Sequence, residues 1–345
     1  MSLNLPDFVP SSQLIVPQTR IVRPRFPVID AHNHLGQFGG HYDHKPPQEL
    51  FARMDEAGVT HYVDLDGGWG EEILQHRLDT FKAYAPERYC VFAGVPWAQW
   101  NEHGDAFGEY AAQRLREQVR WGAWGLKIWK NFGLHERDQR GALVGVDDER
   151  LTPLWETAGE LGVPVVIHVA DPVAFFDPVD ATNERWEELH AHPDWMFTSP
   201  PFPSFMTIMN QFARLVERHP RTTFIGAHVG CYSENLGWVA ALLDRCPNFC
   251  VDISARISEL GRQPYSARRF FLKYADRILF GIDAGPDVEA YRTYYRFLET
   301  DDEYFNYSTG SATPLQGRWY IYGLNLPDDV LQRIYSVNAM RIMRL

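Results

Sequence analysis

The feature that most constrains the fold is a series of short apolar segments that recur along the chain, each bounded by turn-forming residues. Their hydrophobicity is nearly continuous rather than alternating, which is typical of strands buried on both faces of a parallel sheet. Helix-like segments, such as residues 46–58 and 150–162, separate them. The apolar segments lie at residues 26–30, 59–65, 89–95, 124–129, 163–169, 222–228, 248–253 and 277–283.

Strand-like segments that alternate with helix-like segments predict right-handed parallel crossovers, and closure into a (β/α)8 TIM barrel is the simplest arrangement. An open, doubly wound sheet is the main alternative. That fold usually carries a glycine-rich phosphate loop after its first strand, and "HNHLGQFGG" (residues 32–40) does not have this pattern. We therefore predict an α/β fold, a distorted (β/α)8 barrel.

Two connections are much longer than the others, one after the fifth apolar segment and one after the eighth. Long loops after barrel strands gather at the catalytic face. The first of these loops is rich in aromatic residues and proline, and we expect its Phe175, Phe176 and Trp195 to cover that face. The start of the chain predicts an extended N-terminal arm over residues 1–25, followed by one barrel domain over residues 26–345.

The composition limits the partners of the protein. A formal net charge of −12 argues against nucleic acid and against an anionic membrane, because both usually need a basic face. No apolar stretch is long enough to span a bilayer, and the N-terminal segment lacks the features of a signal peptide. We expect a cytoplasmic protein that acts on a small molecule. Its oligomeric state, monomer or homo-oligomer, stays open.

Histidine and aspartate recur at the carboxyl ends of the predicted strands, where a barrel carries its catalytic residues. Residues two apart in an extended chain point the same way, so His32 and His34 should face one point and the residue between them should face away. His168, His228 and Asp283 lie at the ends of three further segments. A single such residue is usually structural, but together they predict a metal site with nitrogen and oxygen ligands.

The segments that carry these residues resemble the amidohydrolase superfamily of metal-dependent barrels. Within it they are similar to the amidohydrolase-related branch, which includes aminocarboxymuconate-semialdehyde decarboxylase and several lactonases. The likeness extends from residue 26 to residue 344. It rests on "DAHNHLG", "GLKIW", "VVIHVADP", "FIGAHVG", "LFGID" and "YSVNAMRI".

The resemblance implies a set of metal ligands. In that family the two histidines of the first strand, the histidine of the fifth and the aspartate of the eighth hold one divalent metal ion. The corresponding residues here are His32, His34, His168 and Asp283. Zinc is the first expectation for the ion, with Mn2+ or another divalent ion as the alternative. The likeness also places His228 beside the metal-bound water.

Lys127 stands where binuclear members of the superfamily carry a carboxylated lysine at the end of the fourth strand. Two roles stay open for it. It could bridge two metal ions, or it could anchor a carboxylate or carbonyl of the substrate as a free ammonium. We favour the anchoring role. We also expect Trp129 and Arg256 in the wall of the pocket, because a guanidinium suits a carboxylate.

These residues support a metal-dependent reaction. A divalent metal activates bound water and polarises a substrate oxygen, Asp283 can carry the proton, and His228 can orient the water or stabilise an oxyanion. By analogy with a mostly hydrolytic superfamily, we predict a hydrolase that acts on an amide or lactone bond of a small, carboxylated molecule. Non-oxidative decarboxylation of a small carboxylic acid, a lyase reaction, is the alternative. A non-catalytic barrel is a third hypothesis, and it predicts a closed metal site without a position for water.

Overall fold

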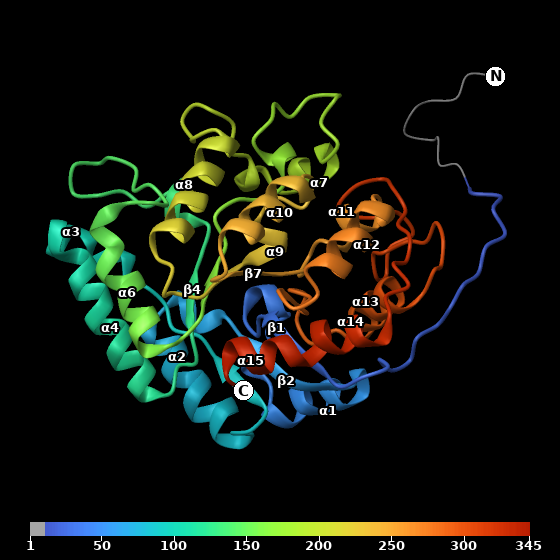
Figure 1. The fold of residues 1–345 in the computed structure, drawn as a ribbon, viewed down its shortest axis with the longest axis horizontal. Coiled ribbons are helices and arrows are strands. Elements are labelled where there is room, and N and C mark those ends of the chain that lie inside the picture. Colours follow the sequence, from blue (N-terminus) through green and yellow to red (C-terminus); the bar gives the residue numbers. More distant parts are fainter. Residues whose placement is uncertain (1–10) are drawn as a thin grey trace.

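The computed structural model describes residues 11–345, and the first ten residues of the predicted arm lie outside the described part. Short parallel strands alternate with helices along this part of the chain (Figure 1). The strands are β1 (Val28–Asn33), β2 (Val59–Asp64), β3 (Tyr89–Val91), β4 (Leu126–Ile128), β5 (Val165–Ile167), β6 (Phe224–Gly226), β7 (Phe249–Asp252) and β8 (Ile278–Leu279).

The strands form two parallel sheets, one with the order β1-β2-β3 and one with the order β4-β5-β6-β7-β8. Backbone hydrogen bonds join the two sheets at both edges. The Lys127 N–H donates to the Ala93 carbonyl at 2.9 Å, and the Ala31 N–H donates to the Phe280 carbonyl at 2.9 Å. The hydrogen bonds thus run around the whole wall, and the predicted (β/α)8 TIM barrel is confirmed.

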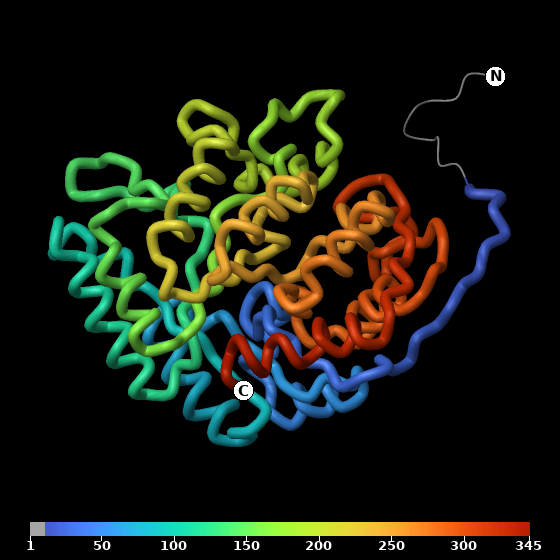
Figure 2. Tube along the Cα trace, in the orientation of Figure 1, coloured from blue at the N-terminus to red at the C-terminus, as the bar shows by residue number. Residues whose placement is uncertain are grey.

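The helices lie around the strands that Figure 1 draws, and their coils form the outer part of the tube trace in the same orientation (Figure 2). Their packing follows from amphipathic sequences: α8 buries Phe205, Ile208, Phe212 and Leu215 along one face, and the Ser204 hydroxyl caps its first turn. The helices are α1 (Pro47–Ala57), α2 (Glu71–Arg77), α3 (Trp100–His103), α4 (Phe107–Trp121), α5 (Asn131–Leu134), α6 (Thr152–Leu161), α7 (Trp186–Ala191), α8 (Phe205–Arg218), α9 (Ala227–Gly230), α10 (Leu236–Arg245), α11 (Ile257–Gly261), α12 (Pro264–Lys273), α13 (Val288–Glu299), α14 (Asp328–Gln332) and α15 (Asn338–Met343).

A compact apolar cluster fills the interior of the barrel, separate from the larger core between strands and helices. The last helix, α15, closes the end of the barrel where the strands begin. Its Ile342 and Met343 belong to the interior cluster, and its Asn338 side chain donates to the carbonyls of Ala275 and Ile278. This end is therefore filled with side chains, which leaves the carboxyl ends of the strands as the open face.

The described part of the N-terminal arm, residues 11–25, has an extended course along the side of the barrel, next to α13 and α14 (Figure 1). Thr19 donates to the Asp302 carboxylate through both its N–H and its hydroxyl, at 2.7 Å each. Arg25 forms ion pairs with Glu299 and Asp328. The arm is thus attached to the barrel by polar contacts. No helix of the described residues is long and apolar enough to cross a membrane.

Candidate metal centre and active site

Three potential metal ligands converge at the carboxyl ends of β1 and β8. The ligand atoms of His32, His34 and Asp283 lie within 4.8 Å of one another, and His34 Nε2 is 3.1 Å from an Asp283 oxygen. Both histidines are almost completely buried. The Asn33 side chain between them turns away and donates to the Gly285 carbonyl, as the alternation along an extended strand predicts.

Carboxylates hold the opposite ring nitrogens of the two histidines. His32 Nδ1 lies 2.8 Å from Asp252, and His34 Nδ1 lies 2.9 Å from Asp66. Because a carboxylate accepts the Nδ1 proton, the neutral rings carry their free lone pair on Nε2. The carboxylates therefore select the tautomer that a metal ligand requires and fix the orientation of each ring.

The charges of His34 and Asp283 are matched to each other. Burial disfavours the charged His34 ring, but hydrogen bonds to Asp283 and Asp66 outweigh burial and raise its pKa to about 9. Burial also disfavours a charged Asp283, yet the hydrogen bond from His34 and the nearby His32 hold its pKa well below the usual range. The pair thus shares a proton that a divalent cation would displace. Two imidazoles and one carboxylate are a donor set that fits a divalent transition metal.

His228 and His168 extend this group of side chains in different ways. His228 Nε2 lies 3.8 Å from an Asp283 oxygen, and its ring centroid is 4.9 Å from that of His32. His168 packs against His228 with ring centroids 4.4 Å apart. Its Nε2 is 3.3 Å from Asp171 without hydrogen-bond geometry, and burial lowers its pKa to about 4. His168 is therefore a neutral, buried nitrogen donor in the same pocket, outside the group of three converging ligands.

Unusual backbone conformations direct two of these side chains. His228 and Asp283 have φ values of 58° and 54°, in the left-handed region that residues other than glycine seldom adopt. The His228 N–H donates to Asp252 at 3.0 Å, and the Asp283 N–H donates to the His32 carbonyl at 3.1 Å. Contacts with neighbouring strands thus hold both turns in place, as is common where strained residues serve a site.

A cavity of about 270 Å³ opens over these residues, and Lys127, Trp129 and Arg256 line it. The Trp129 ring stacks on that of His34, with centroids 5.1 Å apart. Lys127 Nζ lies 4.7 Å above the Trp129 ring and has no hydrogen-bond partner among the described residues. Burial lowers the pKa of Lys127 to about 8. The three residues predicted for the pocket wall are thus in one cavity with the candidate ligands.

The connection after β5 covers part of this cavity. Phe175 and Trp195 line it, as predicted, with ring centroids 6.1 Å apart. Phe176 does not line it. Its ring packs against Phe197 and Phe205, with centroids 5.5 Å and 5.4 Å away. Phe176 directly follows a short 3-10 helix, and its ring is part of the packing of the connection itself.

Asp66, Trp69 and Asp171 are examples of contributors to the site that do not appear among the residues that the sequence predicts. Asp66 follows β2, so the rule about strand ends, applied to the second strand, would have found it. Trp69 stacks on Trp129 with centroids 3.9 Å apart, and nothing in the pattern distinguishes it from a core residue. Asp171 forms an ion pair with Lys130 at the rim of the cavity. In the sequence, Asp171 stands in "HVADP", where it has the pattern of an ordinary polar loop residue.

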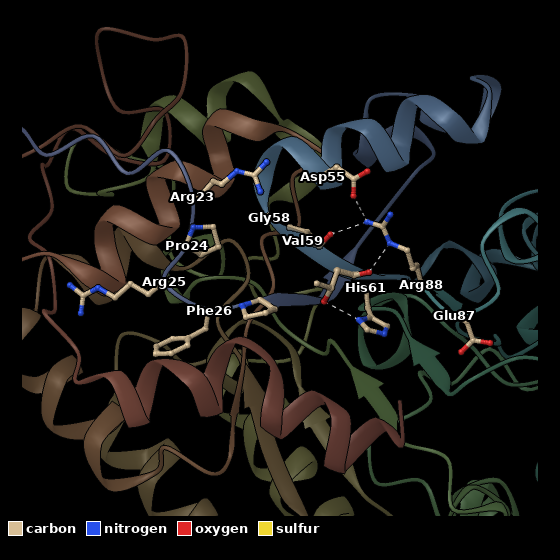
Figure 3. Close-up of a pocket in the computed structure, with 12 residues that line it drawn as sticks. Arg23, Pro24, Arg25, Phe26, Asp55, Gly58, Val59, His61, Glu87 and Arg88 are labelled. Carbon is tan, nitrogen blue, oxygen red and sulfur yellow. Dashed lines mark hydrogen bonds and ion pairs between the residues drawn. The ribbon is translucent and has the colours of Figure 1, made fainter.

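A larger cavity, about 640 Å³, lies at the opposite end of the barrel, beside the start of β1 and β2 (Figure 3). It contains Arg88 and His61, but the Arg88 guanidinium donates to Asp55 and to the carbonyls of Val59 and Thr60. His61 Nδ1 is 3.0 Å from the Thr60 hydroxyl, so the Arg88 and His61 side chains both already have partners within the structure. The converging histidines and Asp283 therefore identify the smaller cavity as the candidate active site.

Replacing Asp252 by asparagine should weaken metal binding, because the amide removes the charge that holds the His32 Nδ1 proton. The loss of such an outer partner typically costs about 10–100-fold in metal affinity. Competition between the apoprotein and a chromogenic chelator measures the change. The exposed Asp301 offers a matched control as Asp301→Asn. Equal metal affinity of the two variants would show that Asp252 does not set the orientation of the ring.

A family model described as an amidohydrolase (Amidohydro_2) matches residues 29–345. Among curated proteins, no match was found. Three solved structures illustrate the fold. The 2,6-dihydroxybenzoate decarboxylase from Rhizobium is 16% identical, with a TM-score of 0.57 over 92% of this chain and 98% of that one. The dihydroxybenzoic acid decarboxylase from Polaromonas sp. JS666, with bound manganese and the inhibitor 2-nitroresorcinol, is 17% identical, with a TM-score of 0.57 and coverages of 92% and 97%.

The third structure, 5-carboxyvanillate decarboxylase from Sphingomonas paucimobilis, is 16% identical, with a TM-score of 0.52 and coverages of 86% and 82%. At these identities the solved structures show a shared fold and no more. The family model, in contrast, extends from the first strand to the last residue of the chain and includes every candidate ligand. The chain therefore belongs to the amidohydrolase family.

Proposed function

We propose that this protein is a metal-dependent, non-oxidative decarboxylase of a small aromatic carboxylic acid. One observation carries the proposal: the candidate metal ligands share a small cavity with an aromatic wall and with cationic groups. Trp129 and Trp69 form the wall, and Lys127 and Arg256 supply the charges. The solved decarboxylases with this fold act, by their names, on such acids. Hydrolysis, the first expectation from the sequence, has no comparable support.

The cavity suits a single ring that carries a carboxylate. Its volume of about 270 Å³ is at the small end for ligand sites. A planar ring can pack against the aromatic side chains that line the cavity, such as Trp69 and Phe175. The Arg256 side chain is almost fully buried and forms no ion pair within the described residues, and its one hydrogen bond is to the Ala255 carbonyl. A buried guanidinium without an acidic partner is a ready anchor for a substrate carboxylate.

His32, His34 and Asp283 would hold the metal ion, with His168 as the further ligand that the family resemblance implies. A bound divalent ion would supply a Lewis acid for the oxygen atoms of the substrate. We place Mn2+ ahead of Zn2+, because the solved structure of the Polaromonas decarboxylase contains manganese. One ion per chain leaves Lys127 free to act as an ammonium rather than as a bridge between two metals.

In the proposed reaction, the bond between the ring carbon and the carboxylate breaks, CO2 leaves, and the electron pair on the ring carbon takes a proton. Burial holds the pKa of His228 well below its usual value, so its ring is neutral at rest. Asp283 is ionised at rest. Both groups are therefore proton acceptors that can receive a proton from solvent or from a substrate hydroxyl. Asp283 then delivers it to the ring carbon, with His228 3.8 Å away as its partner.

The test is a substrate panel. Protein loaded with Mn2+, and in parallel with Zn2+, is incubated with hydroxylated benzoic acids labelled with 13C in the carboxyl group, and with lactones and amides of similar size. We expect labelled CO2 and the corresponding decarboxylated ring. Turnover of a lactone or an amide without release of CO2 would replace the proposal by hydrolysis. No turnover of any compound by fully metal-loaded protein would favour a non-catalytic barrel. Asp283→Asn serves as the control for contaminating enzymes.

The pH dependence tests the role of Lys127. Because its pKa is lowered to about 8, the ammonium is charged at pH 7 and loses its charge as the pH rises through that value. If this charge anchors the substrate carboxylate, kcat/KM should fall by about tenfold per pH unit above the pKa of Lys127. A divalent cation held by the candidate ligands would lower the pKa of Lys127 further and move this fall to lower pH. Lys127→Met should lower kcat/KM at neutral pH and abolish the fall, and the same basic limb in the variant would exclude Lys127 as its source.

A further inference from the structure

A second group of potential metal ligands lies on the loop that follows β1, outside the site described above. His41, Asp43 and His44 offer two imidazole nitrogens and one carboxylate oxygen within 4.8 Å of one another. The two rings face each other almost in parallel, at 15°, with centroids 6.1 Å apart. We propose that this loop cluster, His41, Asp43 and His44, binds a divalent transition-metal ion in addition to the ion of the active site.

The two carboxylate oxygens of Asp43 have different environments. Oδ2 accepts a hydrogen bond from Arg77 at 3.2 Å. Oδ1 is buried and has no hydrogen-bond partner among the described residues, and His44 Nε2 lies 3.9 Å from it. A buried carboxylate oxygen that lacks a donor is destabilising unless a cation reaches it. An ion held between this oxygen and the two imidazoles would satisfy it.

The charges around Asp43 also favour a cation. The Arg77 guanidinium lies 3.2 Å from Asp43, 3.0 Å from Asp64 and 3.7 Å from Asp66. One guanidinium is thus shared among three carboxylates within a largely buried group of side chains. Asp66 is also paired with His34. The uncompensated negative charge beside the guanidinium therefore comes from Asp43 and Asp64, and it favours a further cation beside Asp43.

The donor types indicate the class of metal. Imidazole nitrogen with a single carboxylate suits Zn2+, Co2+ or Ni2+, whereas Ca2+ and Mg2+ prefer sets of oxygen ligands. His41 and His44 are exposed, so an ion can enter from solvent and keep water in its remaining positions. His41, Asp43 and His44 line an open cavity of about 600 Å³. Glu72 and His76 line it as well and offer further donors.

An ion at the loop cluster would act on the wall of the active site. Phe38 belongs to the same loop and lines both this cavity and the active-site cavity. Its ring lies 6.4 Å from that of Trp129 and 6.1 Å from that of His34. Cross-linking His41 to His44 through a metal would therefore hold the loop that carries Phe38 at the edge of the substrate pocket.

Equilibrium dialysis of the full chain against buffered free Zn2+, followed by elemental analysis, tests the inference. Zinc is offered to both the active site and the loop cluster, so that two different metals cannot exchange between the two sites. We expect about two zinc ions per chain in the wild type and about one in His44→Ala and in His41→Asn. Asparagine is chosen at His41 because φ is 56° there, and asparagine tolerates this conformation. Removing a direct ligand should weaken the second site by at least about 100-fold.

His190→Ala, which removes an exposed histidine elsewhere, is the matched control and should keep both ions. Two ions in the wild type and in both loop variants would overturn the inference, since the second ion would then lie elsewhere, for example beside Lys127. One ion in the wild type and in the loop variants would overturn it as well. One ion in the wild type and none in His44→Ala would support the loop cluster and contradict the active-site metal, so the two proposals fail separately.

Discussion

Replacing Asp283 by asparagine is expected to lower turnover by at least about three orders of magnitude. The carboxylate contributes one of three converging ligands, and it is also the proposed proton donor to the substrate carbon. Loss of a positioned proton carrier alone typically costs about 10²–10⁴-fold in rate, and loss of a ligand charge weakens metal binding as well. The variant should therefore show both less bound metal and slower turnover on the substrate that the panel identifies.

Asparagine keeps the left-handed backbone at this position without added strain, so a fall in the melting temperature of the apoprotein should come from the lost ion pair with His34. The exposed Asp301→Asn is the matched control and should retain metal and activity. Metal content from elemental analysis and turnover at saturating metal separate the two roles. Near-wild-type turnover of Asp283→Asn would remove this residue from the proton transfer and contradict the proposed mechanism.

His228→Asn should lower turnover by about two to four orders of magnitude while metal content stays the same. His228 lies beside the three ligands rather than among them, so its loss affects proton transfer and oxyanion stabilisation more than metal binding. Asparagine again fits the φ of 58°, and its amide can replace the hydrogen bond from the ring Nδ1 to the Ser254 carbonyl. The melting temperature should therefore stay near that of the wild type.

A structural role for His228 predicts a different result. Its loss would then remove buried hydrogen bonds and lower the melting temperature, with turnover reduced only in proportion to unfolding. Thermal melts, metal analysis and kinetics on one preparation distinguish the two cases. Turnover close to that of the wild type would leave Asp283 as the only proton carrier in the site.

The barrel was predictable because parallel strands buried on both faces leave a distinctive record of apolar segments, such as 163–169 and 222–228. The strands themselves are shorter than these segments: β8 contains only Ile278 and Leu279. Its apolar segment continues to residue 282, but the chain bends there so that Asp283 can turn into the cavity. An apolar segment indicates which residues are buried. It does not indicate where the strand ends, because the turn that follows the strand is buried as well.

The site could be predicted only in part, for a similar reason. The two-residue spacing of His32 and His34 predicts that both side chains point the same way in an extended chain. In the structure both side chains line the same cavity. His168 lies outside the group of three converging ligands, with its Nε2 3.3 Å from Asp171, and strand periodicity carries no information about that contact. The choice between hydrolysis and decarboxylation depends on the walls of the cavity. These walls come from separate loops whose contacts no local pattern contains.

The left-handed residues at the carboxyl ends of the strands also limit how this protein can evolve. His228, Val229, Ala255 and Asp283 have φ values between 51° and 59°, a conformation that costs about 1–2 kcal/mol for most residues other than glycine. Only glycine, asparagine and aspartate take it cheaply, so few of the single-residue changes open to random mutation are tolerated there. New substrate preferences in descendants of this chain would therefore arise from the long loops above the barrel, while the strand ends beneath them stay nearly fixed.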